Sequence, residues 1–272
     1  MSLQPIYDPE KGLMRVACFV SGSGSNARRI IERSIESDSS FRVVLVFSDV
    51  RDERATRDGA KMCYAKDIAE EYGLGYEFVD IRDFYRKRNT PRTDLSLRPE
   101  FDSKVLNRIT PYNVDLICNA GYMSIMTPKI LNEYKGKIIN VHPADLTIME
   151  GLNRKYVGIH VVEEAIMAGE KVLRSTTHVV RKKVDHGEIL VVSPPLPVEL
   201  PAGVTITQLQ EDKDLRRRVV SEHQDRLKRK GDWVIYPLTV QLIGEGKFSL
   251  NGEGKVFFEE KYMPNGLILP CD

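Results

Sequence analysis

Three residues near the ends of two expected strands could together stabilise negative charge on a carbonyl oxygen. Asn140 and His142 lie two positions apart, just before Pro143, and Asp185 lies further along the chain, just before His186. On an extended strand, residues two apart point to the same face, so the amide and the imidazole can reach one substrate atom. An amide donor, an imidazole and a carboxylate suit a reaction that develops an oxyanion. We therefore expect acyl transfer.

Each of the three side chains has its own expected role. Asn140 would donate hydrogen bonds to the oxyanion without changing charge, and His142 could donate as imidazolium or shuttle a proton near neutral pH. A carboxylate at Asp185 would raise the pKa of His142, and it could orient a water that takes the proton from an attacking amine. The alternative is structural, because Asn-x-His at a strand end is common by chance and Asp-His-Gly is an ordinary turn sequence.

The composition favours a protein that acts on small molecules. The 272 residues can bury a substantial core, and 40 Lys and Arg against 39 Asp and Glu leave no basic excess for nucleic-acid binding. The longest apolar stretches are too short for a membrane span, and the start of the chain does not resemble a signal peptide, so we expect a cytoplasmic protein. The four cysteines show no paired or metal-like spacing, which predicts reduced thiols and no catalytic metal. They are Cys18, Cys63, Cys118 and Cys271.

Strands and helices are expected to alternate along the chain. The apolar run at residues 15–20 is typical of a parallel strand covered on both faces. Further strands are expected at 41–47, 75–79, 115–119, 174–180 and 189–192, and another includes Asn140 after the apolar run 137–139. Helices are expected at 27–37, 55–72, 100–109, 128–134 and 160–168, followed by a largely helical stretch at 206–243 with a break near Gly231 and a hairpin at 248–258. This alternation predicts an α/β fold with a doubly wound, mostly parallel sheet and ligands at the carboxyl ends of its strands.

One segment does not follow the alternation, and one histidine lies in a charged part of the expected helical stretch. Residues 82–98 are rich in charge, Asn, Thr and Pro, and we expect a surface excursion there. His223 lies in a strongly charged segment, so we expect it to face solvent.

The loop from Gly22 to Ala27 permits three interpretations. It fits G-x-G-x-x-A, which would allow a dinucleotide, with Asp49 after the second strand as the acid on the ribose. It could instead hold one phosphate at a helix start, on backbone N–H groups and the side chains of Ser25 and Asn26. A purely structural tight turn is the third. Hydride transfer gives no clear role to the amide, imidazole and carboxylate, so we favour the phosphate site.

Four motifs, in this order, resemble those of the glycinamide ribonucleotide formyltransferase family, within the folate-dependent formyltransferase superfamily. The resemblance begins near Met14 and extends to the tail, where Trp233-Val234-Ile235-Tyr236-Pro237 is also similar. The motifs are Ser21-Gly22-Ser23-Gly24-Ser25-Asn26, Asn119-Ala120-Gly121-Tyr122-Met123-Ser124-Ile125-Met126, Ile139-Asn140-Val141-His142-Pro143 and Val184-Asp185-His186-Gly187.

The resemblance implies a role for particular residues. The implied catalytic residues are Asn140, His142 and Asp185; the implied phosphate and ribose contacts are Gly24, Ser25, Asn26 and Asp232; and the implied folate contacts are Arg98, Met123, Ser124, Ile125 and Met126. His160 and His178 also match family histidines, and we expect them to be hydrogen-bonded structural residues. The chain departs from the family where Ser124 replaces a usual arginine, and where it is several residues longer between His142 and Gly158.

The resemblance implies transfer of a formyl group from 10-formyltetrahydrofolate, as cosubstrate, to the primary amine of a phosphorylated small molecule. Glycinamide ribonucleotide is the expected acceptor, with no metal, no nucleic acid and no membrane involved, and a homodimer is a further expectation. We expect residues 1–13 to be an extension and residues 14–272 a single domain, with a phosphate-binding half at 14–135 and a catalytic and folate-binding half at 136–272.

Three alternatives stay open. The same three catalytic residues could hydrolyse formyltetrahydrofolate, although such relatives carry an extra regulatory domain in front. They could also formylate a sugar amine or a methionyl-tRNA. The third alternative is a non-catalytic nucleotide-binding module, which a turnover assay would separate from all the enzymes.

Overall fold

The computed structural model describes residues 3–56 and 58–271 and divides into two compact units. The N-terminal unit comprises residues 5–140 and 240–247. The C-terminal unit comprises residues 141–239, together with residues 3–4 and 248–271. Strand β6 (Ile138–His142) and helix α9 (Trp233–Gly244) each continue from one unit into the other.

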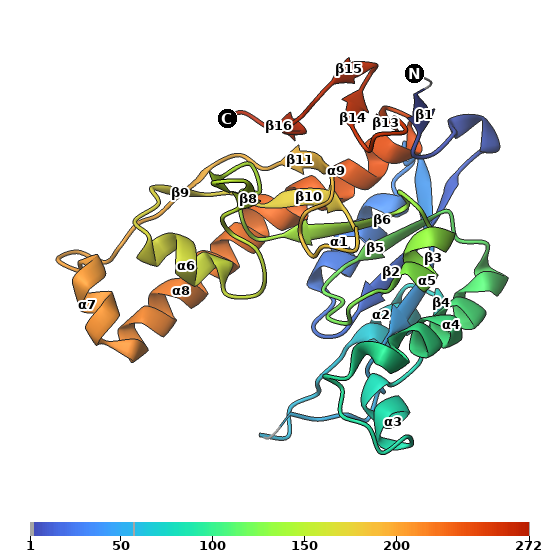
Figure 1. Ribbon diagram of the computed structural model, residues 1–272, viewed down its shortest axis with the longest axis horizontal. Helices are drawn as coiled ribbons and strands as arrows, with labels where there is room; N and C mark the ends of the chain where they lie inside the picture. Colours follow the sequence, from blue (N-terminus) through green and yellow to red (C-terminus); the bar gives the residue numbers. More distant parts are fainter. Residues whose placement is uncertain (1–2, 57, 272) are drawn as a thin grey trace. The chain divides into compact units, whose positions relative to one another are not determined.

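The N-terminal unit is built on a parallel sheet (Figure 1). Its strands are β2 (Met14–Val20), β3 (Phe41–Ser48), β4 (Gly75–Phe78), β5 (Leu116–Asn119) and the beginning of β6, in the spatial order β6-β5-β2-β3-β4. Six of the seven residues of β2 are buried, as expected of a central strand covered on both faces. Strands β3 and β4 extend the sheet on one side of β2, and β5 and β6 extend it on the other. The strand order therefore reverses between β2 and β5, and ligands bind at such a switch point in open α/β sheets.

Helices connect these strands and cover the sheet. They are α1 (Ser25–Ser34), α2 (Ala65–Glu71), α3 (Ile81–Arg86), α4 (Arg98–Ile109) and α5 (Pro128–Glu133), with short 3-10 turns at Pro9–Lys11, Leu95–Leu97 and Thr110–Tyr112. Helices α1 and α2 pack on β3, and α4 packs on β4 and α5.

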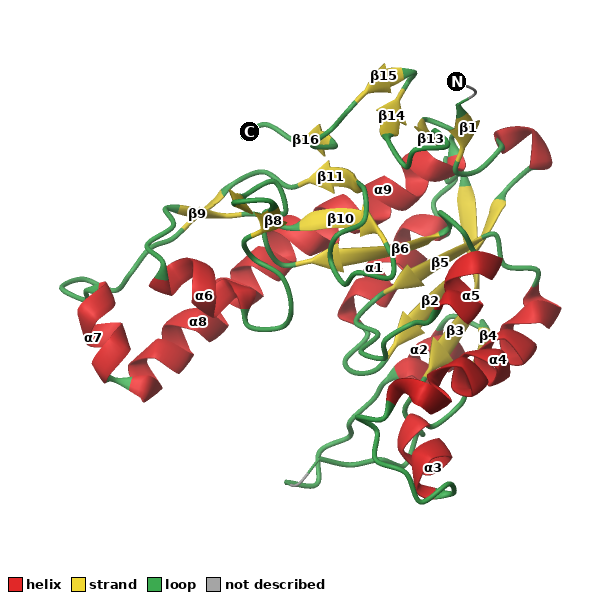
Figure 2. Ribbon diagram, viewed as in Figure 1, coloured by secondary structure: helices red, strands yellow, loops and turns green. Residues whose placement is uncertain are grey.

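The C-terminal unit combines short strands with a cluster of helices (Figure 2). Strand β10 (Thr176–Val179) pairs antiparallel with β11 (Ile189–Val192), which pairs parallel with β16 (Leu267–Ile268). Helices α6 (Val161–Met167), α7 (Ile206–Glu211) and α8 (Lys213–Leu227) pack together around buried aliphatic side chains. The other elements are β1 (Gln4–Pro5), β7 (Met149–Glu150), β8 (Asn153–Arg154), β9 (Val172–Leu173), β12 (Leu196–Pro197), the hairpin β13 (Phe248–Leu250) and β14 (Val256–Phe258), and β15 (Lys261–Tyr262).

The predicted fold class, a mostly parallel α/β sheet, is confirmed. One expectation for the N-terminal unit was wrong in detail, and another missed a short helix. The expected helix at 55–72 exists only as α2, because Thr56 N–H donates to the Ala60 carbonyl and Met62 N–H to that of Arg54, which folds the preceding residues into a turn. The expected surface excursion at 82–98 contains α3, whose first turn is capped by Asp80.

Two expectations for the C-terminal unit were also wrong. The helical stretch breaks at Asp212, whose carboxylate caps α8, whereas Gly231 lies within a π-helical turn, η4 (Lys228–Asp232). His223 is only 2% exposed: its Nδ1 donates to the Val219 carbonyl at 2.7 Å, and its Nε2 accepts from Glu199 N–H at 3.1 Å. His223 lies one turn from Val219 on the face of α8 that packs inward, so its position on the helix outweighs the charged residues around it.

No helix within residues 3–56 and 58–271 is long and apolar enough to cross a membrane.

Candidate active site

The end of β6 carries two of the three predicted catalytic residues. Asn140 and His142 are two positions apart in this strand, so their side chains project from the same face. His142 is 3% exposed, and its Nδ1 lies 3.7 Å from Oδ2 of Asp185. Its Nε2 donates to the carbonyl oxygen of Tyr156 at 3.1 Å. The predicted pairing of His142 with Asp185 is therefore present.

A second histidine lies on the other side of the same carboxylate. His178, on β10, has its Nε2 3.5 Å from Oδ1 of Asp185, and its Nδ1 donates to the Val179 carbonyl at 3.0 Å. His178 thus joins the three predicted catalytic residues, although the sequence suggested that it was only structural. The match of His178 to a family histidine, on the strand before the catalytic aspartate, was the one sequence feature that could have indicated this role. No short spacing motif links His178 to Asp185.

The turn that presents Asp185 is held by two neighbouring segments. Asp185 has a φ of 54°, a left-handed conformation that Asp tolerates better than most residues. Gly158 N–H donates to its Oδ2 at 2.9 Å, and the Arg154 guanidinium donates to the carbonyl oxygens of Asp185 and Gly187 at 2.5 and 2.8 Å. A Cβ at Gly187 would lie 1.7 Å from the Val179 carbonyl oxygen, so this turn requires glycine. Arg154 and Gly158 lie in or after the longer segment that follows His142.

The charges in this cluster differ from the sequence expectation in one respect. Burial would raise the pKa of Asp185, but the His178 hydrogen bond, the nearby His142 and the Gly158 N–H lower it to about 2, so the carboxylate is ionised at neutral pH. Burial lowers the pKa of His142, and the opposing effect of Asp185 is smaller. Asp185 therefore raises the His142 pKa as expected, but burial of the imidazole outweighs this attraction, and the net shift of the pKa is downward.

The predicted phosphate loop lies directly at the start of α1. Gly24 has a φ of 65°, and a Cβ there would lie 2.3 Å from Cδ1 of Ile68, so glycine is required for both reasons. Helix α1 begins at Ser25, followed by Asn26, and no side chain caps its first turn. The N–H groups of a first turn have no partner within the helix, and together with the helix dipole they favour an anion.

Asp49 joins this loop to the segment after β5. Ser21 and Ser124 both donate their hydroxyl protons to its carboxylate, and Met123 N–H donates to the Ser21 oxygen at 2.9 Å. Asp49 is 3% exposed, and burial raises its pKa. Because its oxygens are engaged inside the protein, Asp49 cannot serve as the ribose acid of a dinucleotide site. Ser124 stands where the family usually has an arginine, and here its hydroxyl is hydrogen-bonded to the Asp49 carboxylate.

Four of the five predicted folate contacts line one cavity of 360 Å³. They are Arg98, Met123, Ser124 and Ile125. Met126 belongs to the same segment but is buried in the core. Arg98 is 5% exposed, and its Nε and Nη1 have no hydrogen-bond partner within the described parts of the chain. Unpaired buried donors are costly, so the Arg98 guanidinium suits an anionic group of a ligand.

Comparison with known proteins identifies the family. The family described as formyl transferase matches residues 14–212. The chain belongs to the formyl transferase family. It is 28% identical over 255 residues to the trifunctional purine biosynthetic protein adenosine-3 of Homo sapiens, covering 94% of this chain but only 21% of that protein.

Two further relatives match over nearly their whole length. Phosphoribosylglycinamide formyltransferase of Haemophilus influenzae is 27% identical over 255 residues, covering 93% of this chain and 97% of that one. The crystal structure of glycinamide ribonucleotide transformylase 1 from Symbiobacterium toebii matches with a TM-score of 0.62 and 28% identity, covering 90% of this chain and 94% of that chain. The resemblance inferred from the four motifs is confirmed at the level of the family.

Asp232, the predicted ribose contact of this formyl transferase, lies in η4. It is buried, and the Ser175 hydroxyl donates to its Oδ1 at 2.6 Å. One carboxylate oxygen is therefore used inside the protein, and the ribose contact stays a prediction.

A metal site is not found in the described ranges 3–56 and 58–271, where no group of three or more His, Cys, Asp or Glu side chains is arranged to hold an ion. The four cysteines are free thiols, three of them buried.

Proposed function

We propose that this formyl transferase moves a formyl group from 10-formyltetrahydrofolate to the primary amine of glycinamide ribonucleotide. The observation that carries the proposal is the ionised Asp185, which lies between His142 at the end of β6 and His178 on β10. The near full-length similarity to the Haemophilus influenzae enzyme supports the choice of acceptor.

The proposed chemistry begins with attack of the amine nitrogen on the formyl carbon. The carbonyl π electrons move to the oxygen, and the Asn140 amide donates a hydrogen bond to the oxyanion. His142, whose lowered pKa favours the neutral imidazole, accepts the proton lost by the amine. Asp185 stabilises the resulting imidazolium. When the carbon–nitrogen bond to N10 of the folate breaks, His142 returns the proton to N10, which balances the reaction.

The remaining predicted residues would bind the two substrates. Gly24, Ser25 and Asn26 would hold the ribonucleotide phosphate at the start of α1. Asp232 would contact the ribose. The residues that would hold the folate are Arg98, Met123, Ser124, Ile125 and Met126, and the cavity shared by four of them supports this assignment.

The proposal extends to the organisation of the protein. Residues 14–272 would act as one formyltransferase domain after an extension at 1–13, with a phosphate-binding half at 14–135 and a catalytic and folate-binding half at 136–272. We further propose a homodimer, which light scattering would measure, and a cytoplasmic location, where nucleotide and folate substrates are found.

Alanine substitutions test the proposed catalysis. His142→Ala and Asn140→Ala should each lower single-turnover formyl transfer by about a hundredfold, because each removes a proton carrier or an oxyanion donor. Asn107→Ala, at an exposed position of α4, is the control and should keep the wild-type rate. Circular dichroism would establish that all three variants fold. Wild-type rates in both site variants would exclude these residues from the mechanism.

A further inference from the structure

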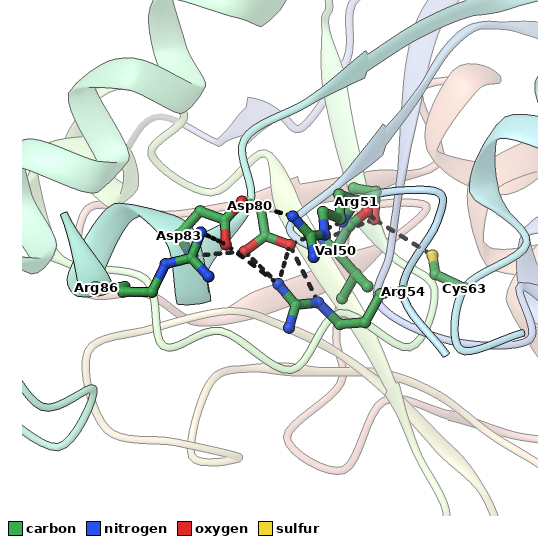
Figure 3. Close-up of polar contacts among 8 residues, drawn as sticks. Val50, Arg51, Arg54, Cys63, Asp80, Asp83 and Arg86 are labelled. Carbon is green, nitrogen blue, oxygen red and sulfur yellow. Dashed lines mark hydrogen bonds and ion pairs between the residues drawn. The ribbon is translucent and has the colours of Figure 1, made fainter. Parts of the chain in front are cut away.

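Asn119, the last residue of β5, is a buried polar side chain whose oxygen has no partner. It is 7% exposed, and its Oδ1 accepts no hydrogen bond within residues 3–56 and 58–271. The buried Asp80 shows the usual arrangement: its two oxygens accept from Arg54 Nη2 at 2.9 and 2.8 Å, and the Asp83 N–H donates to Oδ1 at 2.7 Å (Figure 3). An unpaired buried acceptor is costly, so Asn119 requires an explanation.

The neighbours of Asn119 in the sheet are an aromatic ring on one side and an amide on the other. Asn119 is in register with Phe19 of β2 and with Asn140 of β6, and residues in register on adjacent parallel strands point to the same face, about 4.8 Å apart. The Phe19 ring packs against Phe47 of β3, with the ring centroids 4.7 Å apart. Asn119 therefore adjoins Asn140, the proposed oxyanion donor.

The rest of β5 has no need for an amide at this position. Leu116, Ile117 and Cys118 are buried, as expected of a strand covered on both faces. An apolar residue of the size of Asn would continue this run without leaving an acceptor unpaired. Asn119 also lies at the carboxyl end of β5, where the strand order reverses and ligands bind in open α/β sheets. Its position therefore favours contact with a ligand over a role in packing.

The proposed reaction creates a group that matches such an acceptor. When a primary amine attacks the formyl carbon, that carbon carries an oxyanion and a positively charged nitrogen with two protons. Asn140 donates to the oxyanion and His142 removes one of the two protons, which leaves one N–H without an acceptor. The torsion about the Cβ–Cγ bond of Asn is broad, so the Asn119 amide can turn its oxygen toward this N–H.

We propose that Asn119 Oδ1 accepts the second N–H of the attacking amine. Adjacent strands then hold opposite ends of the adduct, Asn140 the oxygen and Asn119 the nitrogen. The inference rests on the proposed function, which supplies the amine, and it makes Asn119 a residue that selects primary amines. A secondary amine gives its single proton to His142 and has none left for Asn119.

Single-turnover formyl transfer to two amines tests this proposal. The amines are glycinamide ribonucleotide and its analogue with one methyl group on the glycyl nitrogen, which is a secondary amine. The wild-type protein should formylate the primary amine about tenfold faster, because a hydrogen bond to a charged group is worth about that factor. In Asn119→Leu the primary amine should slow about tenfold and the secondary amine little, so the ratio of the two rates should approach one. Leucine is about the size of asparagine, so exclusion of the methyl group by size alone would keep the wild-type ratio.

The same substitution at two other asparagines provides matched controls. Asn140→Leu should slow both amines by the same factor and keep the ratio, since both reactions need the oxyanion donor. Asn107→Leu, at an exposed position of α4, should keep both rates. Asn119→Val removes the same acceptor with a residue that strands favour, and it should repeat the result of Asn119→Leu. Thermal melting should show Asn119→Leu as stable as the wild type or more so, whereas a structural role of Asn119 would lower the melting temperature and slow both amines alike.

The outcomes separate this inference from the proposed function. Equal wild-type rates for the two amines, or a wild-type ratio that persists in Asn119→Leu or Asn119→Val, would overturn the contact and leave formyl transfer standing. Equal slowing of both amines in these variants would assign Asn119 to the oxyanion or to the fold, and would contradict the proposal. Failure of the wild-type protein to formylate either amine would overturn the proposed function, and the role of Asn119 with it.

Discussion

At the scale of single residues, Asp185 determines the electrostatics of the proposed catalytic cluster. The residue types of Asn140, His142 and Asp185 were enough to suggest oxyanion chemistry, because each type has a specific role in it. The net charge of His142 could not be predicted in the same way. It depends on how deeply β6 buries the imidazole, and burial results from packing that two short motifs do not encode.

Replacement of Asp185 by asparagine tests the coupling to His142. Asp185 raises the His142 pKa against the larger effect of burial, so Asp185→Asn should lower that pKa further. NMR titration of the imidazole resonances in both proteins measures the change. A His142 pKa that stays the same or rises would disprove the coupling.

The same substitution should change how stability depends on acid. The Asp185 pKa is about 2 in the folded protein, below the usual value of 3.8. The carboxylate therefore stabilises the fold fully above about pH 4, by roughly 2 kcal/mol, and this contribution is lost as pH falls through about 2. Urea unfolding of wild type and Asp185→Asn from pH 5 to 2 should show a difference that shrinks with acid.

Asp225→Asn, at an exposed position of α8, is the control for this measurement. Its unfolding free energy should follow that of the wild type across the range. A difference between wild type and Asp185→Asn that stays constant with pH would mean that the Asp185 charge contributes nothing to folding.

At the scale of elements, buried strands were predicted best. The apolar runs at β2 and β3 place these strands within one residue of their observed ends, since a covered parallel strand needs a continuous apolar sequence. The turn before α2 and the helix α3 were missed because they depend on contacts between segments, including the Asp80 carboxylate that caps α3 and binds Arg54. Such partners are distant in sequence and leave no periodic pattern.

The turn between β10 and β11 gives a prediction about stability. A Cβ at Gly187 would meet the Val179 backbone carbonyl, which cannot move without disturbing β10, so Gly187→Ala should destabilise the protein by about 3 kcal/mol. Gly252→Ala, where no atom lies within 4 Å of the added Cβ, should be close to neutral. Thermal melting compares the two variants, and equal melting temperatures would show that the Asp185 turn can accommodate a side chain.

At the scale of the whole molecule, the proposed function combines three features that the sequence placed at strand ends. The proposed phosphate loop follows β2, the proposed folate segment follows β5, and the proposed catalytic His142 ends β6. The motif order was sufficient to predict the family. The residues alone could not decide between an amine and water as the acceptor, because the same three proposed catalytic residues would serve both reactions, and only the family resemblance favoured the amine.

The most direct test follows the formyl carbon itself. The protein would be incubated with 10-formyltetrahydrofolate labelled with ¹³C in the formyl group and with glycinamide ribonucleotide, and the products would be observed by ¹³C NMR. The proposed function predicts that the label appears as a formamide on the ribonucleotide amine, with one tetrahydrofolate released for each formamide formed. Label released as formate would indicate a hydrolase, and label that stays on the folate would indicate a binding protein; either result would contradict the proposed formyl transfer.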